Sequence, residues 1–172
     1  AQQVISIVAK DGTVTPLHIR DEPHEAELDV NPNYETDGIR LSYQSLTTPL
    51  TTAWYSLKDS SLITLKRNET PHCDLDSYTS SRLWINATDG TLVPVDVVHH
   101  RETPLNCSAP CLLYAYGAYE ASLPPWFSVA RLSLLDRGWV WALAHPRGGG
   151  EMGRQWYEDG KLENTEQTIV PD

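Results

Sequence analysis

Two tyrosines, Tyr116 and Tyr119, have the side chains best suited to chemistry in this sequence of 172 residues. They follow a short apolar run, Cys111 to Tyr116, that is typical of a buried β-strand. A phenolic hydroxyl at the end of a strand can donate a hydrogen bond to an oxyanion that develops during acyl transfer. A tyrosine in this position can also lie at the edge of a core with its hydroxyl in water, and residue type alone favours this packing role.

A second loop with chemical potential runs from His145 to Gly153 and contains three consecutive glycines. A glycine-rich loop can cradle a phosphate, but this one lacks both the G-x-G-x-x-G pattern and the Lys-Ser/Thr ending of a P-loop. Glycine also permits backbone conformations that other residues avoid, and it lets another chain segment approach closely. We therefore expect a structural loop, in which Arg147 and Glu151 form a bracing ion pair.

Motifs for other kinds of catalysis are missing from the sequence. It contains no G-x-S-x-G nucleophile elbow and no HExxH zinc motif. Cys107 and Cys111, with the pair His99-His100, lack the two tight ligand pairs of a structural zinc site. We therefore expect no metal and no cofactor. The three cysteines, Cys73, Cys107 and Cys111, cannot all pair within one chain, and this odd count predicts free thiols.

The elements that must position these residues change in character near residue 78. Before it, short apolar or alternating runs between polar turns predict only β-strands, as in a β-sandwich or the blades of a β-propeller. The acidic, proline-bearing segment 21–37 is predicted to be a long connection. The predicted strands are 4–8, 14–19, 39–43, 52–57 and 62–65.

After residue 78 the pattern is that of an α/β domain. Asp89-Gly90 predicts a hairpin turn, and a helix capped by Ser128 and ended by Gly138 separates two apolar runs. Strand, helix and strand in this order predict a βαβ unit with two parallel strands. The run 111–116 is expected to be buried on both faces. The predicted strands are 82–86, 92–98, 111–116 and 139–144.

The βαβ unit explains why the two loops belong together. Ligands of parallel α/β sheets bind at the carboxyl ends of the strands. The loops Tyr116 to Pro125 and His145 to Gly153 both leave such ends. The sequence therefore predicts that they meet at one edge of the sheet.

Charge and composition exclude some functions. With 13 Lys+Arg against 23 Asp+Glu the net charge is −10, which repels phosphate backbones and argues against nucleic-acid binding. No apolar run approaches the roughly 20 residues that a membrane-spanning helix needs, so no membrane role is expected. The first residues show no secretory signal, which predicts a cytoplasmic protein.

One long stretch carries a family resemblance. Tyr114 to Gly117, Ala130 to Gly138 and the run Arg147-Gly-Gly-Gly-Glu-Met-Gly-Arg-Gln-Trp-Tyr-Glu-Asp-Gly-Lys-Leu162 resemble the prolyl oligopeptidase family of serine peptidases, above all its oligopeptidase B group. The resemblance implies a mixed fold. Residues 1–78 would be the end of a β-propeller, and residues 79–172 would be the incomplete start of an α/β-hydrolase domain.

The resemblance also implies an activity and site residues. Members of this family are cytosolic peptidases that cut short peptides, and the oligopeptidase B group cuts after Arg or Lys. Tyr116 matches the tyrosine whose hydroxyl contributes to the oxyanion hole. Tyr119 and Trp126 match positions at the substrate-binding cleft. The serine, aspartate and histidine of the triad lie downstream in the family, so none is assigned here.

Several residues depart from the family pattern. Ala115 and Glu120 stand where the group usually has glycine, and Pro124 and Trp126 stand where close relatives carry aspartates that select a second basic residue. A glutamate is costly where the backbone needs a positive φ, so a reshaped loop is expected. Residues 166–172 lack the apolar helix with which the family continues, which predicts that the chain is truncated or altered there.

These observations leave three hypotheses. The first is a peptidase segment that is inert alone and needs the rest of the propeller and hydrolase domains as partners, with short peptides as substrates. The second is a non-catalytic interaction protein derived from the family. The third is a related prolyl oligopeptidase-type enzyme with a different specificity.

Overall fold

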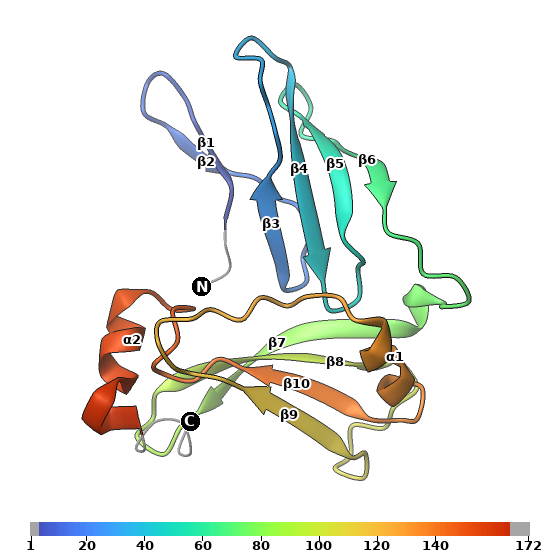
Figure 1. Ribbon diagram of the computed structural model, residues 1–172, viewed down its shortest axis with the longest axis vertical. Coiled ribbons are helices and arrows are strands. Elements are labelled where there is room, and N and C mark those ends of the chain that lie inside the picture. Colours follow the sequence, from blue (N-terminus) through green and yellow to red (C-terminus); the bar gives the residue numbers. More distant parts are fainter. Residues whose placement is uncertain (1–3, 166–172) are drawn as a thin grey trace.

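The structure is a computed structural model that describes residues 4–165, and its strands form three sheets (Figure 1). A two-stranded hairpin and a four-stranded antiparallel sheet lie on one side, and a four-stranded mixed sheet lies across their lower end (Figure 1). Residues 166–172, for which the sequence predicts no apolar helix, lie outside the described residues.

The antiparallel sheet confirms the all-β character of the first part of the chain. Its strands pair in sequence order, each with the next. Alternation buries Leu41 and Tyr43 on the face that also holds Ala53 and Tyr55. The strands are β3 (His24–Leu28), β4 (Gly38–Ser45), β5 (Thr51–Ser56) and β6 (Leu62–Arg67).

Strand β3 corrects the prediction of a long connection over residues 21–37. Only Ala26 of its five residues is a buried apolar side chain, and two glutamates flank it, so the local pattern resembles a polar loop. Pairing with β4 makes the segment a strand, which shows tertiary context overriding a weak local signal.

A hairpin of β1 (Ser6–Val8) and β2 (Val14–Pro16) precedes the antiparallel sheet, as predicted. Its continuation places Leu17 and Ile19 in the same core as the buried residues of β4 and β5. The hairpin therefore packs beside this sheet and extends its core.

The mixed sheet has the strand order β7-β8-β10-β9 and confirms two predictions. The first two strands form the hairpin around Asp89-Gly90, and the last two are parallel and joined by a helix. Ser128 occupies the N-cap position of that helix, although its side chain makes no capping hydrogen bond. The elements are β7 (Tyr78–Asn86), β8 (Leu92–His100), β9 (Cys111–Ala115), α1 (Val129–Leu135) and β10 (Val140–Ala144).

Three short helices complete the described chain. Leu75–Ser77 is a 3₁₀ turn before β7, α2 spans Arg154–Gly160, and Leu162–Asn164 is a second 3₁₀ turn. None of the helices in the described range 4–165 has the length and apolar character that crossing a membrane requires.

One hydrophobic cluster joins the antiparallel and the mixed sheet. Leu46, which follows β4, is fully buried in a cluster with Leu135 of α1 and Leu143 of β10. Burying a leucine completely contributes about 1.5–3 kcal/mol. The cluster therefore holds the lower end of the antiparallel sheet on the face of the mixed sheet that α1 covers.

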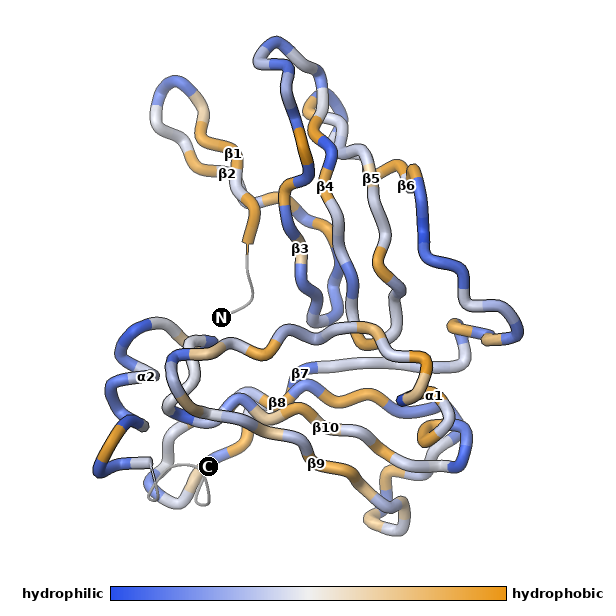
Figure 2. Tube along the Cα trace, viewed as in Figure 1, coloured by the Kyte–Doolittle hydropathy of each residue, from blue (hydrophilic) through white to orange (hydrophobic). Residues whose placement is uncertain are grey.

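The prediction that the run 111–116 is buried on both faces is wrong for this chain. Strand β9 lies at the edge of the mixed sheet, and all of its residues are exposed, including Leu113 at 65%. Figure 2 shows the hydrophobic colouring along this edge. Within residues 4–165, β9 pairs with β10 alone, so one side of the strand has no neighbour to cover it.

Candidate functional site

The candidate site lies where β9 and β10 end side by side. The parallel register pairs Ala144 with Ala115, so His145 and Tyr116 are the next residues of the two strands. The following loops touch, because the amide of Glu120 donates a hydrogen bond to the carbonyl of Gly148 over 3.1 Å. The predicted meeting of the two loops is confirmed.

Tyr116 directly follows β9 at this end of the sheet, and 45% of its surface is exposed. The next residue, Gly117, is buried with φ +64°, and a Cβ there would lie 2.5 Å from Cγ of Pro146 in the second loop. Pro146 of the second loop thus packs directly against the backbone at Gly117. This contact restricts the position of the Tyr116 backbone.

Tyr119 and Glu120 lie at the turn of the first loop and both have left-handed backbone, with φ of +57° and +58°. Such conformations cost non-glycine residues about 1–3 kcal/mol each and persist where the surroundings impose them. Here the contact to Gly148 and an ion pair of 2.6 Å between Glu120 Oε2 and Arg154 Nη1 hold the turn. Tyr119 is 84% exposed, so its ring projects from the turn.

Trp126 directly follows the first loop and lies in an aromatic cluster. Its ring meets those of Tyr114 and Trp141 edge-on, and the Arg131 guanidinium lies 5.3 Å from its centroid and 3.8 Å from that of Trp141. Arg131 Nη1 also donates to the Trp126 carbonyl over 2.8 Å. Burial lowers the pKa of Arg131 to about 10. Trp126 thus anchors the loop on the sheet, and its contact with substrate stays a prediction.

The predicted ion pair between Arg147 and Glu151 is wrong. Arg147 Nη1 donates to Asp89 Oδ2 over 2.7 Å, and so joins the second loop to the β7–β8 turn. The pKa of Asp89 falls to about 2, first through hydrogen bonding to Thr91 and then through Arg147. Glu151 instead ties the two loops together, because its Oε1 accepts from the amide of Leu123 over 3.0 Å and contacts His145 Nδ1 at 3.3 Å.

Beneath the loops lies a row of four charged side chains, linked by hydrogen bonds and ion pairs, that the sequence did not predict. Arg82 of β7 donates two hydrogen bonds to Asp96 of β8, over 2.6 and 2.7 Å. Asp96 Oδ2 also lies 3.0 Å from His145 Nε2, and His145 reaches Glu151. Asp96 is fully buried, and His145 is 2% exposed. The one cue in the sequence is an aspartate inside the valine-rich strand β8.

Burial and pairing act in opposite directions on these groups. Burial alone would raise the pKa of Asp96, but the hydrogen bonds from His145 and Arg82 lower it below its ordinary value. Burial alone would lower the pKa of His145, but Asp96 and Glu151 raise it. Pairing therefore decides the charge of both side chains.

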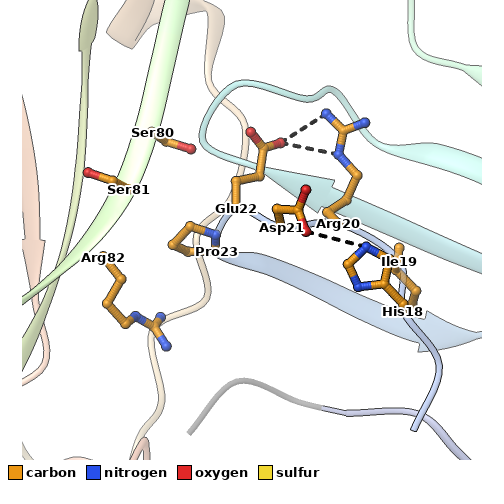
Figure 3. Close-up of a pocket in the computed structure, with 9 residues that line it drawn as sticks. All are labelled: His18, Ile19, Arg20, Asp21, Glu22, Pro23, Ser80, Ser81 and Arg82. Carbon is orange, nitrogen blue, oxygen red and sulfur yellow. Dashed lines mark hydrogen bonds and ion pairs between the residues drawn. The ribbon is translucent and has the colours of Figure 1, made fainter.

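Arg82 lines two cavities that lie between the segment 18–25 and the mixed sheet. The larger, about 710 Å³, has Arg20 and Glu22 on one side and Ser80 and Arg82 of β7 on the other (Figure 3). The smaller, about 80 Å³, lies above His145 and Glu151. His24 and Glu25 of β3, Pro94, Arg82 and residues 122–125 of the first loop also line it.

Substitution of Gly148 tests whether the two loops must touch. Gly148→Ala is expected to lower the free energy of unfolding by about 1–3 kcal/mol more than Gly153→Ala does, because overpacking adds to the backbone strain. Both glycines have positive φ, +99° and +92°. A Cβ at Gly148 would lie 2.2 Å from the Gly117 carbonyl oxygen, whereas at Gly153 it would meet nothing within 4 Å. Equal effects in chemical denaturation would contradict a close contact between the loops.

The amino-acid sequence of this chain is similar to those of known peptidases. Residues 125–170 match the model of the prolyl oligopeptidase family. Dipeptidyl aminopeptidase BI of Pseudoxanthomonas mexicana is 42% identical over 171 residues, which are 99% of this chain and 24% of that protein. Protease 2 of Moraxella lacunata is 33% identical over 95% of this chain and 24% of its own length. The chain belongs to the prolyl oligopeptidase family.

Solved structures agree with this assignment. Oligopeptidase B from Leishmania major superposes with a TM-score of 0.73 at 35% identity, over 87% of this chain and 21% of that one. Prolyl oligopeptidase B from Galerina marginata, bound to a 35-residue substrate, gives 0.83 at 27% identity over 98% and 24%. This chain thus spans about a quarter of the length of the relatives it matches.

Proposed function

We propose that this chain is the junction between a β-propeller, ending near residue 78, and the α/β-hydrolase domain of a serine peptidase that cleaves short peptides after Arg or Lys. One observation carries the proposal. A half-exposed tyrosine, Tyr116, follows a parallel strand at its carboxyl end, beside a second loop that leaves the neighbouring strand. Ligands of parallel sheets bind at such ends.

In the proposed mechanism, Tyr116 donates a hydrogen bond to the oxygen of the scissile carbonyl as it becomes negative. Such a donor accelerates acyl transfer because it is already in place when the charge develops. Tyr119 lines the cleft that takes the peptide, and Trp126 borders it. The nucleophile, base and acid would come from other parts of the peptidase, since the 172 residues contain no G-x-S-x-G elbow.

The exposed edge strand supports a further part of the proposal, that the rest of the propeller and hydrolase domains packs against this chain. Leu112, Leu113 and Tyr114 of β9 are 37%, 65% and 42% exposed. An uncovered, apolar strand edge readily pairs with another strand. A further strand of the hydrolase sheet, beside β9, would cover it. We place the peptidase in the cytoplasm, where members of the family act.

The experiment compares two polypeptides, the 172-residue chain and the peptidase that contains it. We expect the isolated chain to hydrolyse no fluorogenic amide and to react with no serine-directed phosphonate, because it supplies no nucleophile. The containing peptidase should react with the phosphonate and hydrolyse Arg- and Lys-amides. Turnover by the isolated chain above a mock purification would contradict the proposed inertness. A preference for Pro-amides would instead favour a related enzyme of different specificity.

A further inference from the structure

We propose that His145 is a positively charged clamp that positions the loop carrying Tyr116, so that the peptidase works only while this imidazole is doubly protonated. The inference rests on the proposed function for its kinetic consequence. The clamp itself rests on the geometry of three buried side chains, His145, Asp96 and Glu151, and of the partly buried Arg82. His145 is a positioning residue here, because it acts on the oxyanion donor through the loops.

Both ring nitrogens of His145 face carboxylate oxygens. Nε2 lies 3.0 Å from Asp96 Oδ2, and Nδ1 lies 3.3 Å from Glu151 Oε1. An ionised carboxylate only accepts hydrogen bonds, so each ring nitrogen must carry a proton for both contacts to be favourable. A ring with two N–H groups is the imidazolium cation.

The charges of the cluster balance only in that state. Arg82 and protonated His145 contribute two positive charges, and Asp96 and Glu151 contribute two negative ones. Loss of the proton from His145 would leave a net negative charge in a buried site, which is costly.

Two titratable side chains of β3 also approach the cluster, and neither of them supplies the positive charge that His145 would lose on deprotonation. His24 and Glu25 line the small cavity above it. Burial lowers the pKa of His24, which favours its neutral form. Glu25 accepts a hydrogen bond from Gln44 and adds negative charge to the same cavity. The raised pKa of His145 has its causes in Asp96 and Glu151.

Glu151 carries the effect from His145 to the first loop. The same Oε1 atom that contacts His145 accepts the hydrogen bond from the amide of Leu123. Glu151 is 7% exposed, and its other oxygen, Oε2, has no hydrogen-bond partner within the described residues. When His145 is neutral, the Glu151 carboxylate loses the one cationic partner that it has among residues 4–165. It must then take up a proton or turn toward water, and either change weakens its hold on the loop.

The direction of the pH dependence follows from the raised pKa of His145. A histidine whose pKa is higher in the folded state stabilises that state fully below its ordinary value of 6.5. The stabilisation is lost as the pH rises through the raised value. The loop should therefore loosen on the alkaline side. A neutral catalytic histidine, by contrast, would limit activity on the acid side.

Hydrogen exchange of the peptidase that contains this chain tests the clamp without using activity. After correction for the intrinsic exchange rate, amides of residues 118–123 should lose protection as the pH rises past the pKa of His145, while amides of β8 stay protected. His145→Gln should show low protection of the loop at every pH. Protection of the loop that does not depend on pH in the unsubstituted protein would overturn the clamp.

The kinetic arm uses Arg-amide hydrolysis and a matched histidine control. His145→Gln should lower kcat about 10²-fold, the loss typical of a displacement of about 1 Å, with KM little changed and no alkaline decline remaining. His99→Gln, on β8 with its Nδ1 at the His100 carbonyl, should keep the full profile. An unchanged alkaline decline in His145→Gln would overturn the clamp. If the loop titrates but no amide is hydrolysed, the clamp stands and the proposed peptidase function fails.

Discussion

Tyr116→Phe is expected to lower kcat for Arg-amide hydrolysis by about 10²–10³-fold in the peptidase that contains this chain, because that is the usual cost of removing one oxyanion donor. The substitution removes one hydroxyl and keeps the ring. KM should change little, since the hydrogen bond strengthens only as the carbonyl oxygen becomes negative. Steady-state kinetics at the pH of highest activity measure both constants.

Tyr114→Phe is the matched control, because it removes the same kind of hydroxyl two residues earlier, from the strand β9 that Tyr116 follows. The Tyr114 ring packs 6.2 Å from that of Trp126 and 6.4 Å from that of Trp141, centroid to centroid, and phenylalanine preserves both contacts. Its kcat should remain close to that of the unsubstituted enzyme. Equal losses in both variants, or no loss in Tyr116→Phe, would remove Tyr116 from the mechanism.

Asp96→Ala is expected to lower the free energy of opening of the mixed sheet by about 3–5 kcal/mol, since removing one partner of a buried ion pair leaves an uncompensated charge. The fully buried Asp96 carboxylate faces two cations, Arg82 and His145. Native-state hydrogen exchange of β8 amides measures this free energy even when other parts of a large protein unfold separately.

Asp89→Ala provides the contrast for that prediction. Asp89 also pairs with an arginine, Arg147, but its side chain is 49% exposed, so water can replace the lost partner. Exchange of the β8 amides should then match that of the unsubstituted protein within error. If Asp96→Ala leaves the exchange of the β8 amides unchanged, Arg82 and His145 must find other partners. The buried charged side chains would then have no structural role.

The sequence predicted the elements whose signals are local. Asp89-Gly90 specifies a tight turn, and Gly138, at φ +79°, lies just beyond the end of α1. Strand β3 was missed because its polar residues hide one buried alanine, Ala26. The burial of β9 was predicted wrongly because an apolar run does not reveal whether its strand is central or at the edge of the sheet.

The candidate site likewise has parts that the sequence predicted and parts that it did not. Strand order placed Tyr116 and His145 at one edge of the sheet, since a βαβ unit fixes which ends meet. Partners distant in sequence were not predictable, because Asp96 and His145 are 49 positions apart and Asp89 and Arg147 are 58 apart. The expected pairing of Arg147 with Glu151 relied on nearness along the chain, and the fold gave each a different partner.

A crystal structure of the peptidase that contains this chain, with a peptide aldehyde bound covalently to its nucleophile, tests the central assignment most directly. The aldehyde oxygen becomes the equivalent of the oxyanion after the nucleophile adds to the carbonyl carbon. We expect Tyr116 Oη to lie about 2.7–3.1 Å from that oxygen. A Tyr116 hydroxyl turned to solvent, with the oxygen held by other donors, would contradict the assignment.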